Sequence, residues 1–201
     1  MYRVLVVIVK FIYRCMYNVH YEGPENIPQD RTCVYASNHR SYTDPILISL
    51  AVKKRFAYMA KEELFQKNIF FTALIKFMGA FPVVRGKGDT KVIDTSIEKL
   101  EGGRNLVIFP EGTRSYDGKV GKGKSGVALI AAQSGRDVVP VGIVFEGEKL
   151  KFRKKVTVKY GKPIKAEDLQ ISGTSPAELK ALKQKIMGAI KELVEGEQSN
   201  A

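Results

Sequence analysis

The sequence predicts a single-domain α/β fold: a largely parallel or mixed β-sheet flanked by helices, with an N-terminal amphipathic helix at a membrane interface. The length of 201 residues is close to that of one typical domain and allows one sizeable core. Runs rich in β-branched residues alternate with helical stretches, which is typical of a sheet covered on both faces. The first stretch is mostly apolar but carries three basic residues, which favours an interfacial helix.

The N-terminal stretch, MYRVLVVIVKFIYRCMYNV, is expected to form an amphipathic helix over residues 1–19, ahead of one domain over residues 20–201. Arg3, Lys10 and Arg14 fall on one narrow side of a helical wheel. The longest uncharged run is far shorter than the ~20 apolar residues that a spanning helix needs, and a secretory signal fits poorly. We therefore predict a helix in the membrane interface, with its basic side toward the headgroups. The alternative is a terminal helix or strand packed on the body of the protein.

Period-two patterns and β-branched runs predict six strands between turn signals. They cover residues 33–37, 56–60, 80–84, 105–109, 138–145 and 155–160. Apolar residues at helical spacing predict helices over residues 45–52, 62–78, 90–100 and 125–134. Ser175, Pro176 and Glu178 have the order of an N-cap, a first-turn proline and a capping-box acid, so a last helix is expected to start there and to pack through one apolar face.

The net charge of +12 indicates anionic partners. An acidic membrane surface or a phosphorylated substrate fits this charge, whereas the absence of Trp argues against nucleic acid. Cys15 and Cys33 have neither disulfide-framework nor zinc-site spacing, which favours a reducing compartment. With two histidines and no Cys cluster, we expect no metal site.

Three groups of polar residues follow predicted strands. His39 follows the first strand, Arg85 the third, and Glu111, Gly112, Thr113 and Arg114 the fourth. In α/β folds, ligands bind in the crevice beyond the carboxyl ends of the strands. We therefore expect these residues to meet at one rim, although they lie far apart in the sequence.

His39 and Asp44 lie in one short loop, NHRSYTDP, between the first strand and the next helix. Asp before Pro is typical of a helix N-cap, so Asp44 is expected to be fixed at the start of that helix. A fixed carboxylate can accept a hydrogen bond from one imidazole nitrogen and leave the other free to take a proton from a hydroxyl. Each residue alone could be structural, but together they predict a general base and its orienting partner.

The chain offers no clear nucleophile of its own, because no Ser lies in a G-x-S-x-G turn and neither cysteine has a candidate base beside it in sequence. The simplest mechanism uses a hydroxyl of the substrate, which attacks an activated acyl group. Arg85 and Arg114 at the same rim suggest a phosphate-bearing ligand, since guanidinium groups bind phosphate in bidentate fashion. Either arginine alone would also suit a solvated surface.

Two basic segments have competing interpretations. Residues 118–125, GKVGKGKS, match the phosphate-loop pattern G-x-x-x-x-G-K-[ST]. A phosphate loop starts directly at a strand end, whereas the preceding strand is predicted to end at position 109, so nucleotide hydrolysis is disfavoured. The segment KLKFRKK at 149–155 suits either a solvated strand edge or a second contact with acidic lipid.

NHRSYTD contains the His-x4-Asp block of the glycerolipid acyltransferases, and the sequence resembles the 1-acylglycerol-3-phosphate acyltransferase family. Four blocks stand in that family's order: NHRSYTD, GAFPVVRG at 79–86, FPEGTRS at 109–115 and VVPVGI at 138–143. YGKPI at 160–164 extends the resemblance toward the C-terminus. The sequence departs from the family at the N-terminus, where a single helix is expected in place of any larger membrane anchor.

The resemblance implies transfer of a fatty acyl group from acyl-CoA or acyl-carrier protein to the free hydroxyl of 1-acyl-glycerol-3-phosphate, giving phosphatidate. His39 would be the general base and Asp44 its orienting partner, and Arg85 with the four residues from Glu111 to Arg114 would form the acceptor site. No metal or bound cofactor is implied.

Together with the basic N-terminal helix, this reading predicts a peripheral or monotopic enzyme on the cytoplasmic side of the cell membrane. Its expected partners are a lysophospholipid, an acyl thioester, an acidic membrane surface and, if it is the donor, acyl-carrier protein. The alternatives are a different acceptor, such as glycerol-3-phosphate or another lysolipid, and a non-catalytic basic lipid-binding module.

Overall fold

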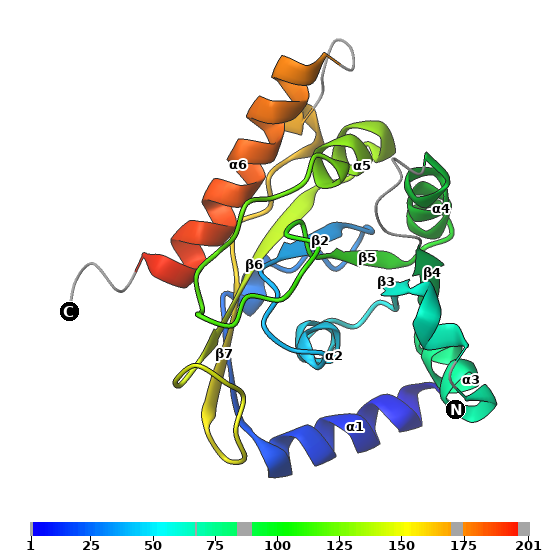
Figure 1. Ribbon diagram of the computed structural model, residues 1–201, viewed down its shortest axis with the longest axis vertical. Coiled ribbons are helices and arrows are strands. Elements are labelled where there is room, and N and C mark those ends of the chain that lie inside the picture. The colour runs from blue at the N-terminus through cyan, green and yellow to red at the C-terminus, as the bar shows by residue number, and fades with distance from the viewer. Residues whose placement is uncertain (1, 67, 84–89, 170–174, 197–201) are drawn as a thin grey trace.

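The computed structural model describes residues 2–66, 68–83, 90–169 and 175–196, which contain one seven-stranded sheet and the helices around it (Figure 1). The strands are β1 (Asn18–Glu22), β2 (Val34–Ser37), β3 (Phe56–Lys61), β4 (Ala80–Val83), β5 (Asn105–Ile108), β6 (Val138–Phe145) and β7 (Lys155–Tyr160). The α-helices are α1 (Tyr2–Met16), α2 (Asp44–Ser49), α3 (Ile69–Met78), α4 (Thr90–Glu101), α5 (Gly126–Ser134) and α6 (Pro176–Glu195). Short 3-10 helices are η1 (Pro24–Asn26), η2 (Glu62–Phe65) and η3 (Ala166–Leu169).

The sheet is mixed, as the sequence predicted, with the strand order β1-β7-β6-β2-β5-β3-β4. The five strands from β6 to β4 in that order run parallel to one another, whereas β7 is antiparallel to β6 and β1 runs parallel to β7. Because β2, β5 and β6 are parallel neighbours, the loops that follow their carboxyl ends lie at one edge of the sheet.

Helices cover both faces of the sheet, with α4, α5 and α6 on one side and α1 and α2 on the other (Figure 1). The alternation along β2 explains this arrangement. Val34 and Ala36 belong to the buried cluster beneath α4, α5 and α6, whereas Tyr35 between them belongs to the cluster that also contains Leu47 and Ile48 of α2. Side chains of a strand point alternately to opposite faces, so both faces of β2 are apolar and both are covered.

The N-terminal segment is a helix, so the strand alternative for it is wrong. Its helix α1 ends at Met16, and β1 follows directly from Asn18. β1 was not predicted, and the expected boundary between residues 19 and 20 falls inside it. Among the helices that the structure describes, none combines the length and apolarity that crossing a membrane requires.

The single helix predicted over residues 62–78 is wrong, because two separate helices, η2 and α3, occupy this part of the chain. Asn68 starts α3 from an extended conformation, and its side-chain oxygen accepts the N–H groups of Phe70 and Phe71 at 2.8 and 3.3 Å. This is N-cap geometry, which begins a new helix. Gly79 ends α3 at φ 104°, where an added Cβ would lie 2.2 Å from the Phe56 carbonyl oxygen.

The last helix, α6, begins as predicted. The Ser175 hydroxyl accepts the Glu178 N–H at 3.2 Å and donates to the Glu178 carboxylate at 2.9 Å. Leu182, Ile186 and Ile190 of its apolar face are buried against the sheet. The role of α6 is therefore to close one side of the core.

Candidate active site

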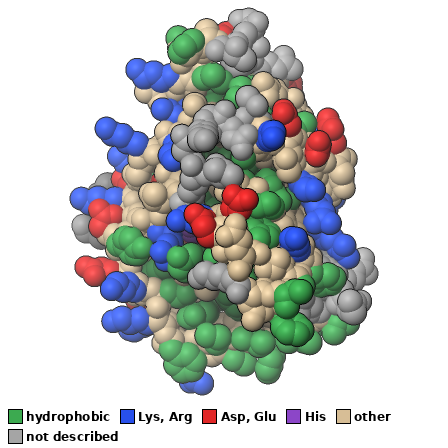
Figure 2. Space-filling view, turned by 45° about the vertical axis from the view of Figure 1, so that its right-hand side comes forward, with side chains coloured by type: hydrophobic (Ala, Val, Ile, Leu, Met, Phe, Trp, Pro, Cys, Tyr) green, Lys and Arg blue, Asp and Glu red, His purple; other side chains and the backbone are tan. Residues whose placement is uncertain are grey.

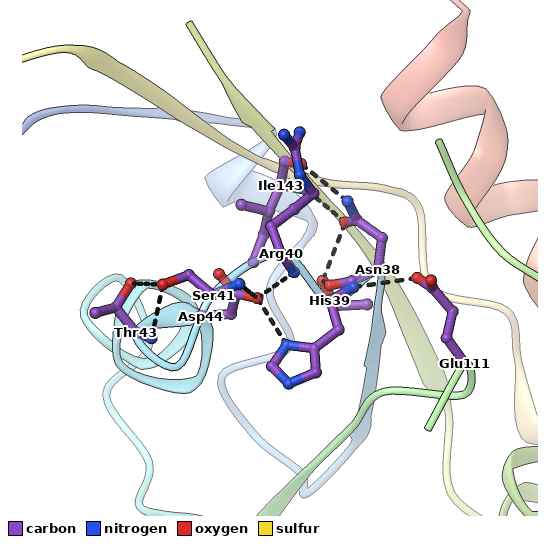
Figure 3. Close-up of polar contacts among 9 residues, drawn as sticks. Asn38, His39, Arg40, Ser41, Thr43, Asp44, Glu111 and Ile143 are labelled. Carbon is purple, nitrogen blue, oxygen red and sulfur yellow. Dashed lines mark hydrogen bonds and ion pairs between the residues drawn. The ribbon is translucent and has the colours of Figure 1, made fainter. Parts of the chain in front are cut away.

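The loops after β2 and β5 meet at the predicted rim (Figure 3). The first loop carries His39 and leads into α2, and the second contains the FPEGTRS segment and leads toward α5. A backbone contact joins them: the Ser115 N–H donates to the His39 carbonyl at 2.7 Å. Within the second loop, the Lys124 N–H donates to the Pro110 carbonyl at 2.8 Å. Residues 109–115 therefore lie against the histidine loop, as the strand-end argument predicted.

His39 and Asp44 form the expected pair. Nδ1 of His39 lies 2.8 Å from Oδ2 of Asp44, and the other ring nitrogen points away from the carboxylate (Figure 3). The side chain of Asp44 is fully buried, and that of His39 is 13% exposed. A carboxylate accepts hydrogen bonds, so this geometry assigns the proton of the neutral ring to Nδ1 and leaves a lone pair on Nε2. The pair is thus arranged for Nε2 to take a proton from a hydroxyl.

Asp44 does not cap α2, which corrects the sequence prediction. It is the first residue of the helix, and Thr43 occupies the N-cap position without a side-chain capping bond. The Asp44 carboxylate instead accepts the N–H groups of Arg40 and Ser41 at 2.6 and 2.7 Å, which lie before it in the loop. The buried carboxylate therefore stabilises the turn of the loop and orients the His39 ring at the same time.

α1 packs on the same buried cluster as α2, the helix that follows this loop. Burial, with smaller contributions from the charges of Tyr17 and Asp44, raises the pKa of the Tyr13 hydroxyl to about 12. Tyr13 of α1 and Tyr17, which follows the helix, pack against the buried cluster that includes Leu47 of α2. The inner face of α1 therefore covers the same core layer as α2.

Glu111 holds His39 through the backbone. Its Oε1 accepts the His39 N–H at 3.1 Å, and the carboxylate also accepts the Gly121 N–H. Burial raises the pKa of the Glu111 carboxyl, and these two hydrogen bonds and the His39 ring oppose that effect. The carboxylate is therefore occupied by the chain's own backbone rather than presented to the open rim.

Phe109 completes the support of the imidazole. Its ring stacks on the His39 ring with centroids 4.0 Å apart and an angle of 19° between the planes. Contacts from the FPEGTRS segment thus reach the ring, the N–H and the carbonyl of His39. This segment positions the histidine in addition to any contact that it makes with substrate.

Arg114 lies between two exposed aromatic rings at the rim. Its guanidinium stands 3.8 Å from the Tyr42 ring centroid and 5.5 Å from that of Tyr116, and it donates to the Tyr42 hydroxyl at 3.2 Å. Thr113 beside it is exposed. This arrangement keeps a cation at the rim with donors free for an anion.

Gly112 and Lys124 lie in contact at the same rim. Gly112 has φ 70°, and an added Cβ would come within 3.0 Å of the Lys124 ammonium nitrogen. The segment that resembles a phosphate loop begins at Gly118 and so does not start at the end of β5, which is Ile108; α5 follows it. Its lysine instead places positive charge beside the FPEGTRS turn.

Arg85, the remaining predicted site residue, lies outside the described residues.

Arg40 is a buried cation next to the dyad. Its guanidinium lies 4.8 Å from the Phe145 ring centroid and donates to the Glu148 carbonyl at 2.6 Å. Burial lowers the pKa of Arg40, against the opposing effect of three nearby carboxylates, of which Asp44 contributes most. The side chain therefore ties the connection after β6 to the histidine loop.

A family model described as Acyltransferase matches residues 18–144, which include both loops of this site. The chain belongs to the acyltransferase family. It is 31% identical to the 1-acyl-sn-glycerol-3-phosphate acyltransferase of Bacillus subtilis over 96% of each chain. It is 36% identical to the chloroplastic 1-acyl-sn-glycerol-3-phosphate acyltransferase LPAT1 of Arabidopsis thaliana over 66% of this chain, but it spans only 37% of the length of that protein.

The fold of this acyltransferase is also similar to a solved structure. The crystal structure of the 1-acyl-sn-glycerophosphate (LPA) acyltransferase PlsC from Thermotoga maritima superposes with a TM-score of 0.70 and 29% sequence identity. The match covers 95% of this chain and 78% of the other. The single-domain α/β fold predicted from the sequence is therefore confirmed.

Sequence reasoning missed several residues that support the dyad of this acyltransferase. Asn38 is buried, and its amide exchanges two hydrogen bonds with the Ile143 backbone at 2.7 and 2.9 Å, which ends the β2–β6 pairing and turns the chain toward His39. An amide directly after a buried strand and before the histidine was a signal for this role. Phe109 and Arg40 gave no comparable signal, because their contacts join distant segments.

No group of three or more His, Cys, Asp or Glu side chains in the described part of the chain is arranged to hold a metal ion. The expectation that the reaction needs no metal or bound cofactor stays a prediction.

Proposed function

We propose that this chain transfers a fatty acyl group from an acyl thioester to the free hydroxyl of 1-acyl-sn-glycerol-3-phosphate, forming phosphatidate. The observation that carries the proposal is the His39–Asp44 contact of 2.8 Å at the strand-end rim. The similarity to enzymes named for this reaction supports the acceptor. A non-catalytic lipid-binding module would not require a histidine whose ring, N–H and carbonyl are all fixed by contacts.

The chemistry follows from the free ring nitrogen. Nε2 of His39 takes the proton of the acceptor hydroxyl while that oxygen attacks the thioester carbonyl. The tetrahedral intermediate collapses with cleavage of the carbon–sulfur bond, and the proton on Nε2 passes to the leaving thiolate. Asp44 stabilises the imidazolium that exists between these two steps.

The acceptor phosphate would bind to the cations of the rim. Arg114 stacks on Tyr42 of the loop that carries His39, and the Lys124 side chain lies against Gly112. Two cations close to one turn suit a phosphate monoester. The resemblance to the family adds Arg85 to this set.

The reaction itself is the first test. Purified protein is incubated with 1-acyl-sn-glycerol-3-phosphate and labelled acyl-CoA or acyl-carrier protein, and the products are identified by mass spectrometry. Phosphatidate should form with the wild type and with His20→Ala, because His20 is the other histidine of the chain and lies exposed on β1. His39→Ala should reduce the rate by roughly 10²–10⁴-fold.

A panel of acceptors and both donors settles the finer assignments. Faster acylation of glycerol-3-phosphate or of a lysolipid without a phosphate monoester would replace the proposed acceptor. No acylation of any acceptor by folded wild-type protein would contradict an enzymatic function. The two donors are compared in the same assay, because nothing in the rim distinguishes the two acyl carriers.

We further propose that the enzyme acts as a peripheral or monotopic protein on an acidic membrane surface, on the cytoplasmic side of the cell membrane. Its substrate and product are lipids, and its net charge is +12. α1 exposes Lys10, Arg14 and several apolar side chains to solvent; the side chain of Arg3 lies outside the described part. Sedimentation with vesicles that is lost at high salt would support this placement.

A further inference from the structure

Most of the large hydrophobic side chains that the described residues expose lie at one end of the molecule. Of fourteen such side chains, six belong to α1, five to α3 and one, Phe152, to the connection between β6 and β7. All three segments occupy the lower end of the long axis in Figure 1. Figure 2 shows hydrophobic side chains gathered along the same lower side. The remaining two, Tyr42 and Tyr116, flank Arg114 at the active-site rim.

α3 turns its apolar side outward. Eight of its ten residues are apolar, yet none is buried. Ile69 and Phe70 are 79% and 84% exposed, and Leu74 on the next turn is 49% exposed. A helix that packs on a core would bury such residues, and contiguous exposed apolar surface on a soluble protein marks a site of interaction.

α1 adds a second apolar strip. Val4, Val7 and Phe11 lie on consecutive turns and are 61%, 65% and 69% exposed. The opposite side of α1 packs against the core through Tyr13, and Tyr17, just after the helix, packs there too. The outward strip is therefore fixed in place by the fold.

Cations border the apolar surface where α1 ends. Arg14, Asn18 and Arg153 line part of a surface depression of about 550 Å³ there. The Arg153 N–H donates to the carbonyl of Met16, the last residue of α1, at 2.7 Å, and among the described residues Arg153 is the only non-glycine with positive φ. Phe152 beside it is 67% exposed. Apolar side chains next to guanidinium groups match acyl chains next to lipid phosphates.

We propose that α3 is a second membrane-inserting element, which forms one bilayer-contacting face together with α1 and Phe152. Ile69, Phe70 and Leu74 insert among the acyl chains, and Arg14 and Arg153 contact the phosphates of anionic lipid. This inference rests on the proposed function at a membrane surface and adds a contact outside the N-terminal segment. An anionic bilayer is favoured over a protein partner because the apolar surface spans three separate segments and carries a cationic border.

A single tryptophan tests the insertion without disturbing the fold, because the chain contains no Trp. Phe70→Trp is compared with Ala177→Trp, an exposed position on α6 at the opposite end of the long axis (Figure 1). Vesicles of equal parts phosphatidylcholine and phosphatidylglycerol should shift the emission of Phe70→Trp to the blue, and bromine-labelled acyl chains should quench it. Ala177→Trp should show neither effect. Emission of Phe70→Trp that vesicles leave unchanged would overturn the proposal.

Polar substitutions measure the contribution of α3. Phe70→Gln combined with Leu74→Gln should weaken partitioning into the same vesicles by at least about tenfold for each side chain, because each loses an apolar side chain that would be buried among the acyl chains. The charge change Lys76→Glu on α3 should also weaken binding, whereas Lys180→Glu, its matched control on α6, should not. Binding that is equal in wild type and double variant would contradict the role of α3.

Activity on two forms of acceptor separates this inference from the proposed function. The double variant should acylate a short-chain, monomeric lysophosphatidate at the wild-type rate and a vesicle-bound one more slowly. If wild type acylates neither acceptor, the proposed function fails, and the fluorescence result still decides the docking face. If the double variant loses self-association instead of vesicle binding, the face is a contact between copies of the chain and the inference is wrong.

Discussion

The carboxylate of Glu111 accepts the backbone N–H of His39 at 3.1 Å, although the two residues lie 72 positions apart. Ser115 binds the carbonyl of the same histidine, and Phe109 stacks on its ring. One loop therefore fixes the position of His39, the proposed general base, while Asp44 fixes the orientation of its ring. The energetic consequences of these contacts can be measured separately.

Replacement of Glu111 by alanine should lower both stability and turnover. Two backbone N–H groups, of His39 and Gly121, would lose their acceptor, at a cost of about 1–3 kcal/mol for each group that stays buried and unpaired. The histidine loop would also lose the hydrogen bond that holds the His39 backbone. Because the ring would then be less well placed for proton transfer, kcat should fall by a larger factor than KM rises. Urea unfolding and steady-state kinetics of the same preparation measure both effects, and unchanged kcat in a folded variant would contradict the positioning role.

Glu111 should also leave a signature in the pH dependence of stability. Burial raises the pKa of this carboxyl in the folded state above its ordinary value of 4.5, so folding favours the protonated form. Its contribution to the free energy of unfolding is thus full below that value and is lost as the pH rises through the raised pKa. The stability of wild type relative to Glu111→Gln should therefore decrease from acidic to neutral pH. A difference that is independent of pH would show that the carboxyl does not titrate in this way.

Asp44→Asn should reduce kcat by roughly 10²-fold or more, because the amide cannot stabilise the imidazolium that forms during transfer. The KM for the acceptor should change little, since the Asp44 side chain is fully buried and has no surface to offer the acceptor. Asp94→Asn on the exposed side of α4 is a matched control and should behave as wild type. Similar kcat values for both variants would remove Asp44 from the mechanism.

Arg114→Ala should raise the KM for a phosphate-bearing acceptor by about tenfold or more, which corresponds to the loss of one charge-assisted hydrogen bond. Tyr42→Phe should have a smaller effect, because it keeps the ring 3.8 Å from the guanidinium and removes only the hydroxyl contact. The internal control is a monoacylglycerol, which lacks the phosphate. An equal rise in KM for both acceptors would argue for a structural role instead.

The two cysteines should differ strongly in reactivity. Cys15 is exposed, whereas Cys33 is buried and its thiol pKa is raised to about 12, mainly by burial. At pH values near 8 the Cys33 thiol is protonated and therefore unreactive. A maleimide should modify one thiol quickly and the second only after unfolding, and Cys15→Ser should abolish the fast phase. Two fast phases in the folded protein would contradict the buried position of Cys33.

The sequence anticipated elements whose signals are local. The bounds of β6 and β7 were predicted without error, and Ser175 and Glu178 identified the start of α6. The start of α3 was missed although Asn68 is a favourable N-cap residue. β1 was missed for a different reason: its pairing with β7 joins residues more than a hundred positions apart, and five residues carry too little periodicity to reveal it.

The sequence by itself determined the parallel core and the pair His39 and Asp44, because alternation along strands and the spacing within one loop are local properties. Only the tertiary structure decided that Asp44 binds backward into its loop, that Glu111 faces the His39 backbone and that α3 points its apolar side outward. Those outcomes depend on which distant segment packs beside each residue. The residue pattern of one segment does not show which other segment will be its neighbour in the folded protein.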